Sequence, residues 1–88
     1  MSAALPARDG MATGQQRVAL AARVHGWIAN VVDGQFIYRR PGTPSWVSVM
    51  YAFDGTILWA DGQTLAREPR HFSGGGKADR LVAFLAEC

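Results

Sequence analysis

The residues best suited to chemistry surround a glycine run, His71-Phe-Ser-Gly-Gly-Gly76-Lys77-Ala78. A Walker A loop has the pattern G-x-x-x-x-G-K-[ST], in which backbone N–H groups hold phosphates and the hydroxyl binds Mg²⁺. Here His71 replaces the first glycine and Ala78 replaces the hydroxyl residue, so we expect no nucleotide hydrolase. A glycine-rich loop that opens a helix, with Lys77 and Arg70 nearby, could hold an anion. Glycine runs are more often flexible linkers, and we prefer that interpretation.

The other polar residues give little support for catalysis or metal binding. His25 and His71 are far apart in the sequence and Cys88 is the only cysteine, so no cluster has the spacing of metal ligands. Turn chemistry explains three carboxylates, because each directly precedes a glycine: Asp33, Asp54 and Asp61. We therefore expect a protein that is not an enzyme, with no catalytic, cofactor-binding or metal-binding residues and no cofactor.

Composition and charge describe one small globular domain. The chain has 88 residues, 49% of them hydrophobic, and nine basic against seven acidic side chains give a formal charge of +2. This apolar content excludes an intrinsically disordered protein. No apolar run approaches the roughly 20 residues of a membrane span, and no signal peptide is recognisable. We expect no membrane association and a cytoplasmic location.

Three Asp-Gly pairs separate apolar runs after Trp27 and predict tight β-hairpins. A two-residue type I′ turn needs positive φ at both central residues, which Asp tolerates and Gly adopts freely. The pairs are Asp33-Gly34, Asp54-Gly55 and Asp61-Gly62. Strands are then expected at about 24–32, 35–40, 45–53, 56–60 and 63–67, with a longer connection at 41–44.

These turns also predict which side chains share a face, because residues paired across a hairpin lie on one side of the sheet. The first turn should pair Val32 with Gln35, Val31 with Phe36 and Ala29 with Tyr38. One face should collect Val47, Val49, Tyr51, Phe53, Leu58 and Leu65. The opposite face should collect Trp46, Met50, Ile57 and Trp59, with Ser48 and Thr64 among them.

The two ends of the chain differ in how clearly they can be interpreted. Residues 77–87 predict a helix whose apolar stripe covers the first face: Ala78, Leu81, Val82 and Leu85, with Phe84 beside it. Residues 17–24 fit either a helical stripe or an alternating strand, and we favour a strand that begins near Arg17. Residues 1–16 are expected to be a flexible arm, and Met11 is an alternative start.

The expected fold class is therefore α+β. It is an antiparallel β-meander of four to five strands joined by Asp-Gly hairpin turns, with one C-terminal helix packed on one face. Residues 17–88 should form this single domain after the N-terminal arm, 1–16. The opposite face is then either covered by residues 5–24 folding back, or left open with two tryptophans on it.

An uncovered face of this composition predicts protein binding, because monomers rarely expose a large apolar patch and Trp, Met and Arg are enriched at interfaces. We expect a small non-enzymatic protein-binding domain that forms a homodimer through this face or an edge strand, or acts as an inhibitor or adaptor of a larger partner. Its small size is typical of proteins encoded by phages and other mobile elements. The expected partner-binding residues are Trp46, Met50, Trp59, Tyr38, Arg39 and Arg40.

The alternative is a nucleic-acid-binding module. Aromatic side chains on a sheet with basic neighbours can stack on bases and contact phosphates, and the residues concerned are Tyr38, Arg39, Arg40, Trp46, Trp59 and Arg70. Against this alternative, strand alternation sends Arg39 and Arg40 to opposite faces, and no known nucleic-acid-binding signature is present.

Overall fold

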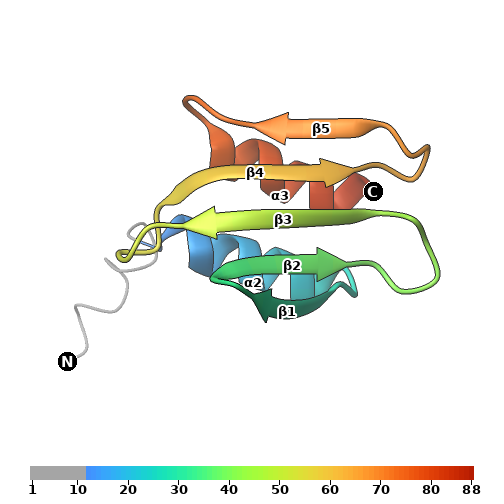
Figure 1. Ribbon diagram of the computed structural model, residues 1–88, viewed down its shortest axis with the longest axis horizontal. Helices are drawn as coiled ribbons and strands as arrows, with labels where there is room; N and C mark the ends of the chain where they lie inside the picture. Colours follow the sequence, from blue (N-terminus) through green and yellow to red (C-terminus); the bar gives the residue numbers. More distant parts are fainter. Residues whose placement is uncertain (1–11) are drawn as a thin grey trace.

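The computed structural model describes residues 12–88 and has the predicted α+β class (Figure 1). The predicted arm's residues 1–11, and with them the alternative start at Met11, lie outside the described residues. The elements in chain order are α2 (Gly14–Val24), β1 (Ile28–Val32), β2 (Gln35–Arg39), β3 (Trp46–Tyr51), β4 (Ile57–Gln63), β5 (Pro69–Phe72) and α3 (Lys77–Glu87). The five strands form one antiparallel meander in the order β1-β2-β3-β4-β5, which confirms the predicted topology.

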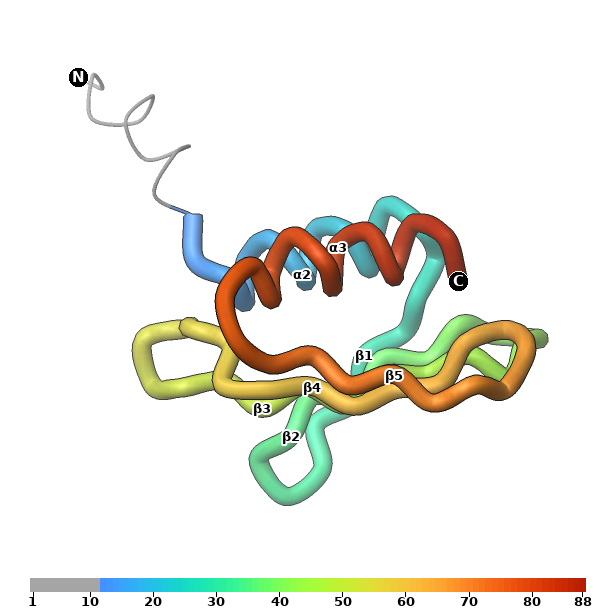
Figure 2. Tube along the Cα trace, turned by 90° about the horizontal axis from the view of Figure 1, so that it is seen from above, coloured from blue at the N-terminus to red at the C-terminus, as the bar shows by residue number. Residues whose placement is uncertain are grey.

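Both helices lie on the same side of the sheet, as Figure 2 shows when the sheet is seen edge-on. We call this side the covered face and the opposite side the open face. The C-terminal helix has the predicted bounds and buries Leu81, Phe84 and Leu85. Residues 12–24 do not fold back over the opposite face, because α2 packs beside α3, and the rest of the predicted cover, residues 5–11, lies outside the described residues. No described helix covers the open face.

The strand predicted from Arg17 is wrong, because this segment is helix α2. A capping box starts the helix: the Gln16 N–H donates to Thr13 Oγ1 at 3.1 Å, and the Thr13 N–H donates to Gln16 Oε1 at 3.0 Å. The alanine-rich sequence favours this helix, and its buried residues are Val18, Ala21 and Ala22. The segment is therefore a helix, although Leu20 and Val24, the apolar stripe that suggested one, lie on its exposed side.

The first Asp-Gly turn is confirmed, whereas the second differs in length. Asp33 and Gly34 have φ of 50° and 80°, as a type I′ turn requires, and β1 pairs with β2 in the predicted register. The second hairpin closes with Ala52 N–H donating to the Thr56 carbonyl at 2.7 Å, which leaves three residues in the loop.

A β-bulge in β4 then compensates for the extra loop residue. Tyr51 pairs with Ile57 but Met50 pairs with Trp59, so Leu58 has no opposite residue. Ile57 is consequently buried rather than on the open face, and Leu58 is exposed rather than in the core. Beyond the bulge, the predicted register and the predicted sides of β3 hold.

The third Asp-Gly turn is wrong, because Asp61 and Gly62 lie inside β4. The chain reverses instead at residues 64–68, where the Thr64 N–H donates to the Glu68 carbonyl at 2.9 Å and Arg67 takes a left-handed φ of 64°. Residues 64–67 of the predicted strand 63–67 therefore form this turn, Gln63 ends β4, and β5 follows. Two residues assigned to faces of the sheet, Thr64 and Leu65, lie in the turn, as the fully exposed Phe53 does in the preceding one.

The core fills the space between the covered face and the two helices. The sheet contributes Tyr38, Val47, Val49, Ile57, Ala60 and Phe72. Trp27, just before β1, packs on Phe84 with ring centroids 5.8 Å apart, and its Nε1–H donates to the Leu85 carbonyl at 2.9 Å. The indole thus ties the start of the sheet to the end of α3.

Candidate protein-binding surface

The open face consists of alternate residues of the strands, arranged in rows that cross the sheet. The first row is Ile28, Arg39, Trp46, Gln63 and Pro69. The second row is Asn30, Ile37, Ser48, Asp61 and His71. The third row is Val32, Gln35, Met50 and Trp59. Large apolar side chains therefore lie at both ends of β3, as Trp46 and Met50, and at one end of β4, as Trp59, with Ser48 and Asp61 between them.

The three apolar residues predicted for partner binding lie on this face. Met50 and Trp59 are cross-strand partners, and Trp46 is on the same strand as Met50, four residues earlier. All three side chains are half-buried, so each still presents part of its surface to solvent. Val47 and Val49, their neighbours on β3, are fully buried on the covered face, which fixes the orientation of the strand. The predicted separation of Trp46, Met50 and Trp59 from the valines is thus observed.

Only one of the other three predicted partner-binding residues lies with them. Arg39 is exposed in the row of Trp46. Tyr38 points to the covered face, where it is 2% exposed and its hydroxyl lies 3.0 Å from that of Tyr51. Arg40 donates from Nη1 to the carbonyl oxygen of Cys88, at the end of α3. The structure therefore does not bring Tyr38 or Arg40 to the open face, because the strand alternates about Arg39.

Burial controls the electrostatics of the tyrosine pair. Removal from water raises the pKa of Tyr38, and the hydrogen bond from Tyr51 opposes this shift in part. The pKa of Tyr51 is also raised, first by burial and then by its hydrogen bond with Tyr38. Both hydroxyls stay protonated at neutral pH, and the pair stabilises the sheet beneath α2 rather than offering a binding group.

A polar row on the open face was missed by sequence reasoning. Ser48 Oγ donates to Gln35 Oε1 at 2.5 Å, and His71 Nδ1 lies 2.5 Å from Asp61 Oδ1. The row places Asp61 between Ser48 and His71, so the imidazole is two strand spacings, about 10 Å, from the hydroxyl. A Ser–His–Asp triad needs the imidazole in the middle. The row is therefore a set of satisfied polar contacts, and only the correct β4–β5 register would have revealed it.

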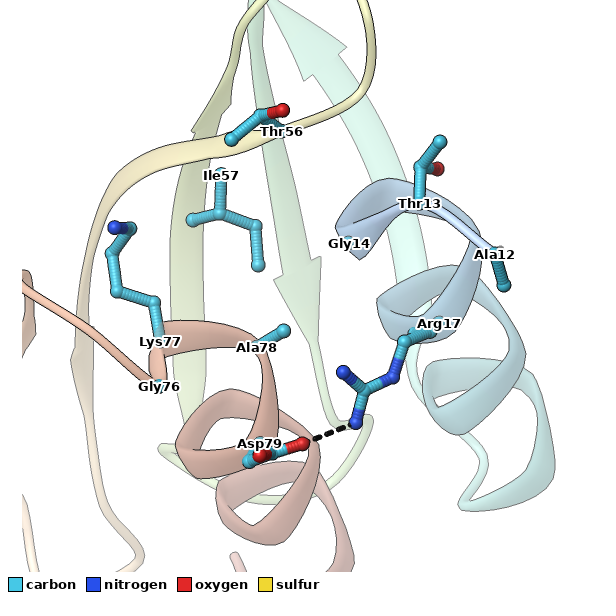
Figure 3. A pocket seen from close by; sticks show the side chains of 10 residues that line it. All are labelled: Ala12, Thr13, Gly14, Arg17, Thr56, Ile57, Gly76, Lys77, Ala78 and Asp79. Carbon is cyan, nitrogen blue, oxygen red and sulfur yellow. Dashed lines mark hydrogen bonds and ion pairs between the residues drawn. The ribbon is translucent and has the colours of Figure 1, made fainter. Parts of the chain in front are cut away.

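A separate pocket of about 390 Å³ lies where the two helices begin (Figure 3). Arg17 Nη2 reaches across it to Asp79 Oδ1 at 2.5 Å. The glycine-rich loop next to it uses its cations internally: Lys77 Nζ donates to the Gly74 carbonyl at 2.8 Å, and Arg80 donates to the carbonyls of Ser73 and Gly75. These contacts fit the preferred interpretation of a linker rather than an anion-binding loop.

Within residues 12–88, no three His, Cys, Asp or Glu side chains gather closely enough to hold a metal ion. Neither described helix has the length and apolar character needed to cross a membrane. Comparison of the chain with protein-family models, with curated proteins and with solved structures found no match.

Proposed function

We propose that this protein is a small non-enzymatic protein-binding domain whose open face docks on a protein partner. One observation carries the proposal: both helices cover the same side of the sheet, while Trp46, Met50 and Trp59 lie on the other. An apolar cluster of this kind on a sheet face favours burial against a partner, because monomers rarely expose large contiguous apolar patches. Binding through such a face would make the protein an adaptor or inhibitor of a larger protein, a role typical of small mobile-element proteins.

The composition of the open face suits an interface. Trp, Met and Arg are the side chains enriched in interface cores, and Trp is the commonest anchor. Ser48 already bonds to Gln35 and Asp61 to His71, so a partner can cover Ser48 and Asp61 without leaving them unpaired. Loss of one indole anchor would cost about 2 kcal/mol, or roughly 30-fold in affinity.

The charge of this face favours a protein partner over nucleic acid. Within the described strands, Arg39 is the one Lys or Arg side chain on the open face. Asp61 adds a carboxylate to the neighbouring row. Phosphate binding needs several cations on one surface, because each neutralised phosphate contributes to affinity. Arg40, which the nucleic-acid alternative requires on the same surface, is bonded to α3 instead.

A nucleic-acid-binding module is the second candidate, and the two indoles beside Arg39 are the observation that favours it. Indole rings on a sheet can stack on unpaired bases. Binding to fluorescent single- and double-stranded oligonucleotides across a salt series separates the candidates, since phosphate-dominated binding weakens steeply with salt. Tight binding at low salt that Arg39→Ala weakens would favour nucleic acid. No binding at low salt would remove this candidate.

Affinity capture tests the protein-binding proposal. Tagged wild type is compared with a Trp46→Asp, Trp59→Asp variant in lysate of the source cells. The matched control is Leu20→Asp, Val24→Asp, which places the same charges on α2, where these side chains are 60% and 66% exposed. We expect a defined protein to be retained by wild type and control and lost with the tryptophan variant.

Two results of the capture experiment would contradict the proposal, provided that the variants are folded. Far-UV circular dichroism must first show that each variant is folded, with Trp59→Ser as the milder substitution where the double variant is not. Equal retention of the same protein by wild type and by the folded tryptophan variant would reject the open face as the docking surface. Retention of no specific protein by wild type would reject the proposal as a whole.

A further inference from the structure

The two edges of the sheet are protected to different degrees. The β5 edge begins with Pro69, which has no N–H, and continues with Arg70 and His71. Proline and charge are the usual guards against strand addition. The β1 edge has the sequence Ile-Ala-Asn-Val-Val, without charge or proline, and all five residues are exposed. An unguarded apolar edge of this kind is a template for a further strand.

The register of the first hairpin identifies the backbone groups free to pair. A two-residue turn makes Val32 and Gln35 a hydrogen-bonded pair, and such pairs then alternate along the strands. Ile28, Asn30 and Val32 therefore bond to β2. The N–H and C=O groups of Ala29 and Val31 point away from the sheet, where no described strand meets them.

We propose that β1 of one molecule pairs antiparallel with β1 of a second copy, about a twofold axis at Asn30, to give a continuous ten-stranded sheet. In this arrangement Ala29 exchanges hydrogen bonds with the second copy's Val31, and the symmetric pair does the same. The inference extends the proposed function, because it names a self-association surface distinct from the open face.

The shape of the edge fits this occupant on the covered side. A groove of about 290 Å³ runs between α2 and the β1 edge, lined by Ala19, Ala22, Arg23, Trp27, Ala29, Phe36 and Tyr38. The small Ala29 leaves room at the point where pairing would place the second copy's Val31. Val31 is 61% exposed in the single molecule. In the dimer, Val31 of each copy would lie over the groove of the other, so both valines and both grooves would be covered.

Charge selects the antiparallel orientation. Asp33 follows the C-terminal end of β1, and Arg39 lies beside Ile28 at its N-terminal end. Antiparallel pairing brings the second copy's Val32 opposite Ile28, which places its Asp33 at the same end of the edge as Arg39, about two strand spacings away. A second hollow of about 290 Å³ lies at this end of the open side, lined in part by Ile28, Asn30 and Arg39. Parallel pairing would place like charges together.

The twofold axis makes a charge-swap experiment decisive, because it sets each Asn30 directly opposite its copy. Light scattering after gel filtration should give wild type twice the 9.5 kDa mass of one chain as concentration rises. Asn30→Lys alone and Asn30→Glu alone should each be monomeric at the same concentration. An equimolar mixture of the two should regain the doubled mass, and the matched control Leu20→Lys should behave as wild type.

Amide exchange supplies a readout at the paired groups themselves. The Ala29 and Val31 amides should become protected as wild-type concentration rises, and should exchange freely in Asn30→Lys. Monomeric wild type at millimolar concentration, dimeric single variants, or a mixture that stays monomeric would each overturn the proposal. Protection of these amides only when a captured partner is added would overturn it too, and would assign the edge to that partner.

The experiment separates this inference from the proposed function. If the dimer survives in Asn30→Lys but is lost in the Trp46→Asp, Trp59→Asp variant, copies associate through the open face and the edge proposal is wrong. If the Asn30 variants are monomeric and still retain the captured protein, both proposals stand. If the mixture of Asn30→Lys and Asn30→Glu dimerises but wild type captures no specific protein, the edge dimer stands and docking on the open face is rejected.

Discussion

Replacing Gly62 by alanine tests the packing that holds β3 against β4. A Cβ atom at residue 62 would lie 2.7 Å from the Trp46 carbonyl oxygen and 3.0 Å from Val47 Cβ. The first distance is shorter than real Cβ contacts, and the neighbour is backbone, which cannot rotate away. Glycine is therefore needed here for close approach inside a strand, rather than for the turn that the Asp-Gly pair predicts.

The expected size of the effect follows from two opposing contributions. Gly62→Ala restricts the unfolded chain, which would stabilise the protein by about 0.4–1 kcal/mol if the new side chain fitted. Overpacking against Trp46 and Val47 costs about 1–3 kcal/mol. The two ranges combine to a net destabilisation between about 0 and 2.6 kcal/mol, and the short contact with backbone places the expected value at about 1–2 kcal/mol. For a domain of this size the melting temperature should fall by about 4–16 °C.

Thermal and urea unfolding followed by circular dichroism measure this change. Gly75→Ala is the matched control, because no atom lies within 4 Å of a Cβ there and its φ suits any residue. The control should stabilise the protein by about 0.4–1 kcal/mol, because it restricts the unfolded chain and creates no close contact. Stability of Gly62→Ala equal to or above wild type would refute the close β3–β4 contact and the strand assignment of Asp61 and Gly62.

Two further substitutions test the covered face. Burial raises the pKa of Tyr38 and Tyr51, so stability is complete below the ordinary tyrosine pKa of about 10 and falls above it, by up to about 1.4 kcal/mol per pH unit for each. Urea unfolding at several pH values above about 10 should show that the free energy of unfolding falls less steeply with pH for Tyr51→Phe than for wild type. Equal slopes for the two proteins would contradict this prediction. Trp27→Phe removes the buried N–H bonded to the Leu85 carbonyl and should cost about 1–3 kcal/mol. Trp59→Phe, on the open face, is the control and should lower the free energy of unfolding by less than about 0.5 kcal/mol. Equal losses for Trp27→Phe and Trp59→Phe would contradict a structural role for the Trp27 N–H.

Local signals in the sequence were sufficient for part of the fold. The turn at Asp33-Gly34 determined the β1–β2 register because its two residues are flanked directly by the pair Val32 and Gln35, with no bulge in either strand. The helix over 77–87 has an unbroken apolar stripe that matches its buried side. The opposite orientations of Val49 and Met50 followed from strand alternation alone, whereas the sequence left open whether residues 5–24 cover the face that bears Met50.

The errors arose where long-range packing overrode local turn chemistry. Asp61-Gly62 resembles a hairpin turn, but β3 pairs with β4 as far as Gln63, and the pair is drawn into the strand. The bulge at Leu58 changes the side of Ile57, and neither residue type signals it. For α2, the pair Thr13 and Gln16 was a readable capping box, and weighing it would have corrected the strand assignment.

Site-specific photocrosslinking in the source cells tests the open face most directly. The photoreactive residue p-benzoylphenylalanine replaces Trp46, Trp59 or Leu20, one at a time, and irradiation captures whatever lies within reach. We predict that positions 46 and 59, on one face of the sheet, crosslink to the same protein, whereas position 20 on α2 does not. Crosslinks from position 20 alone, or crosslinks from 46 and 59 only to nucleic acid, would contradict protein docking on the open face.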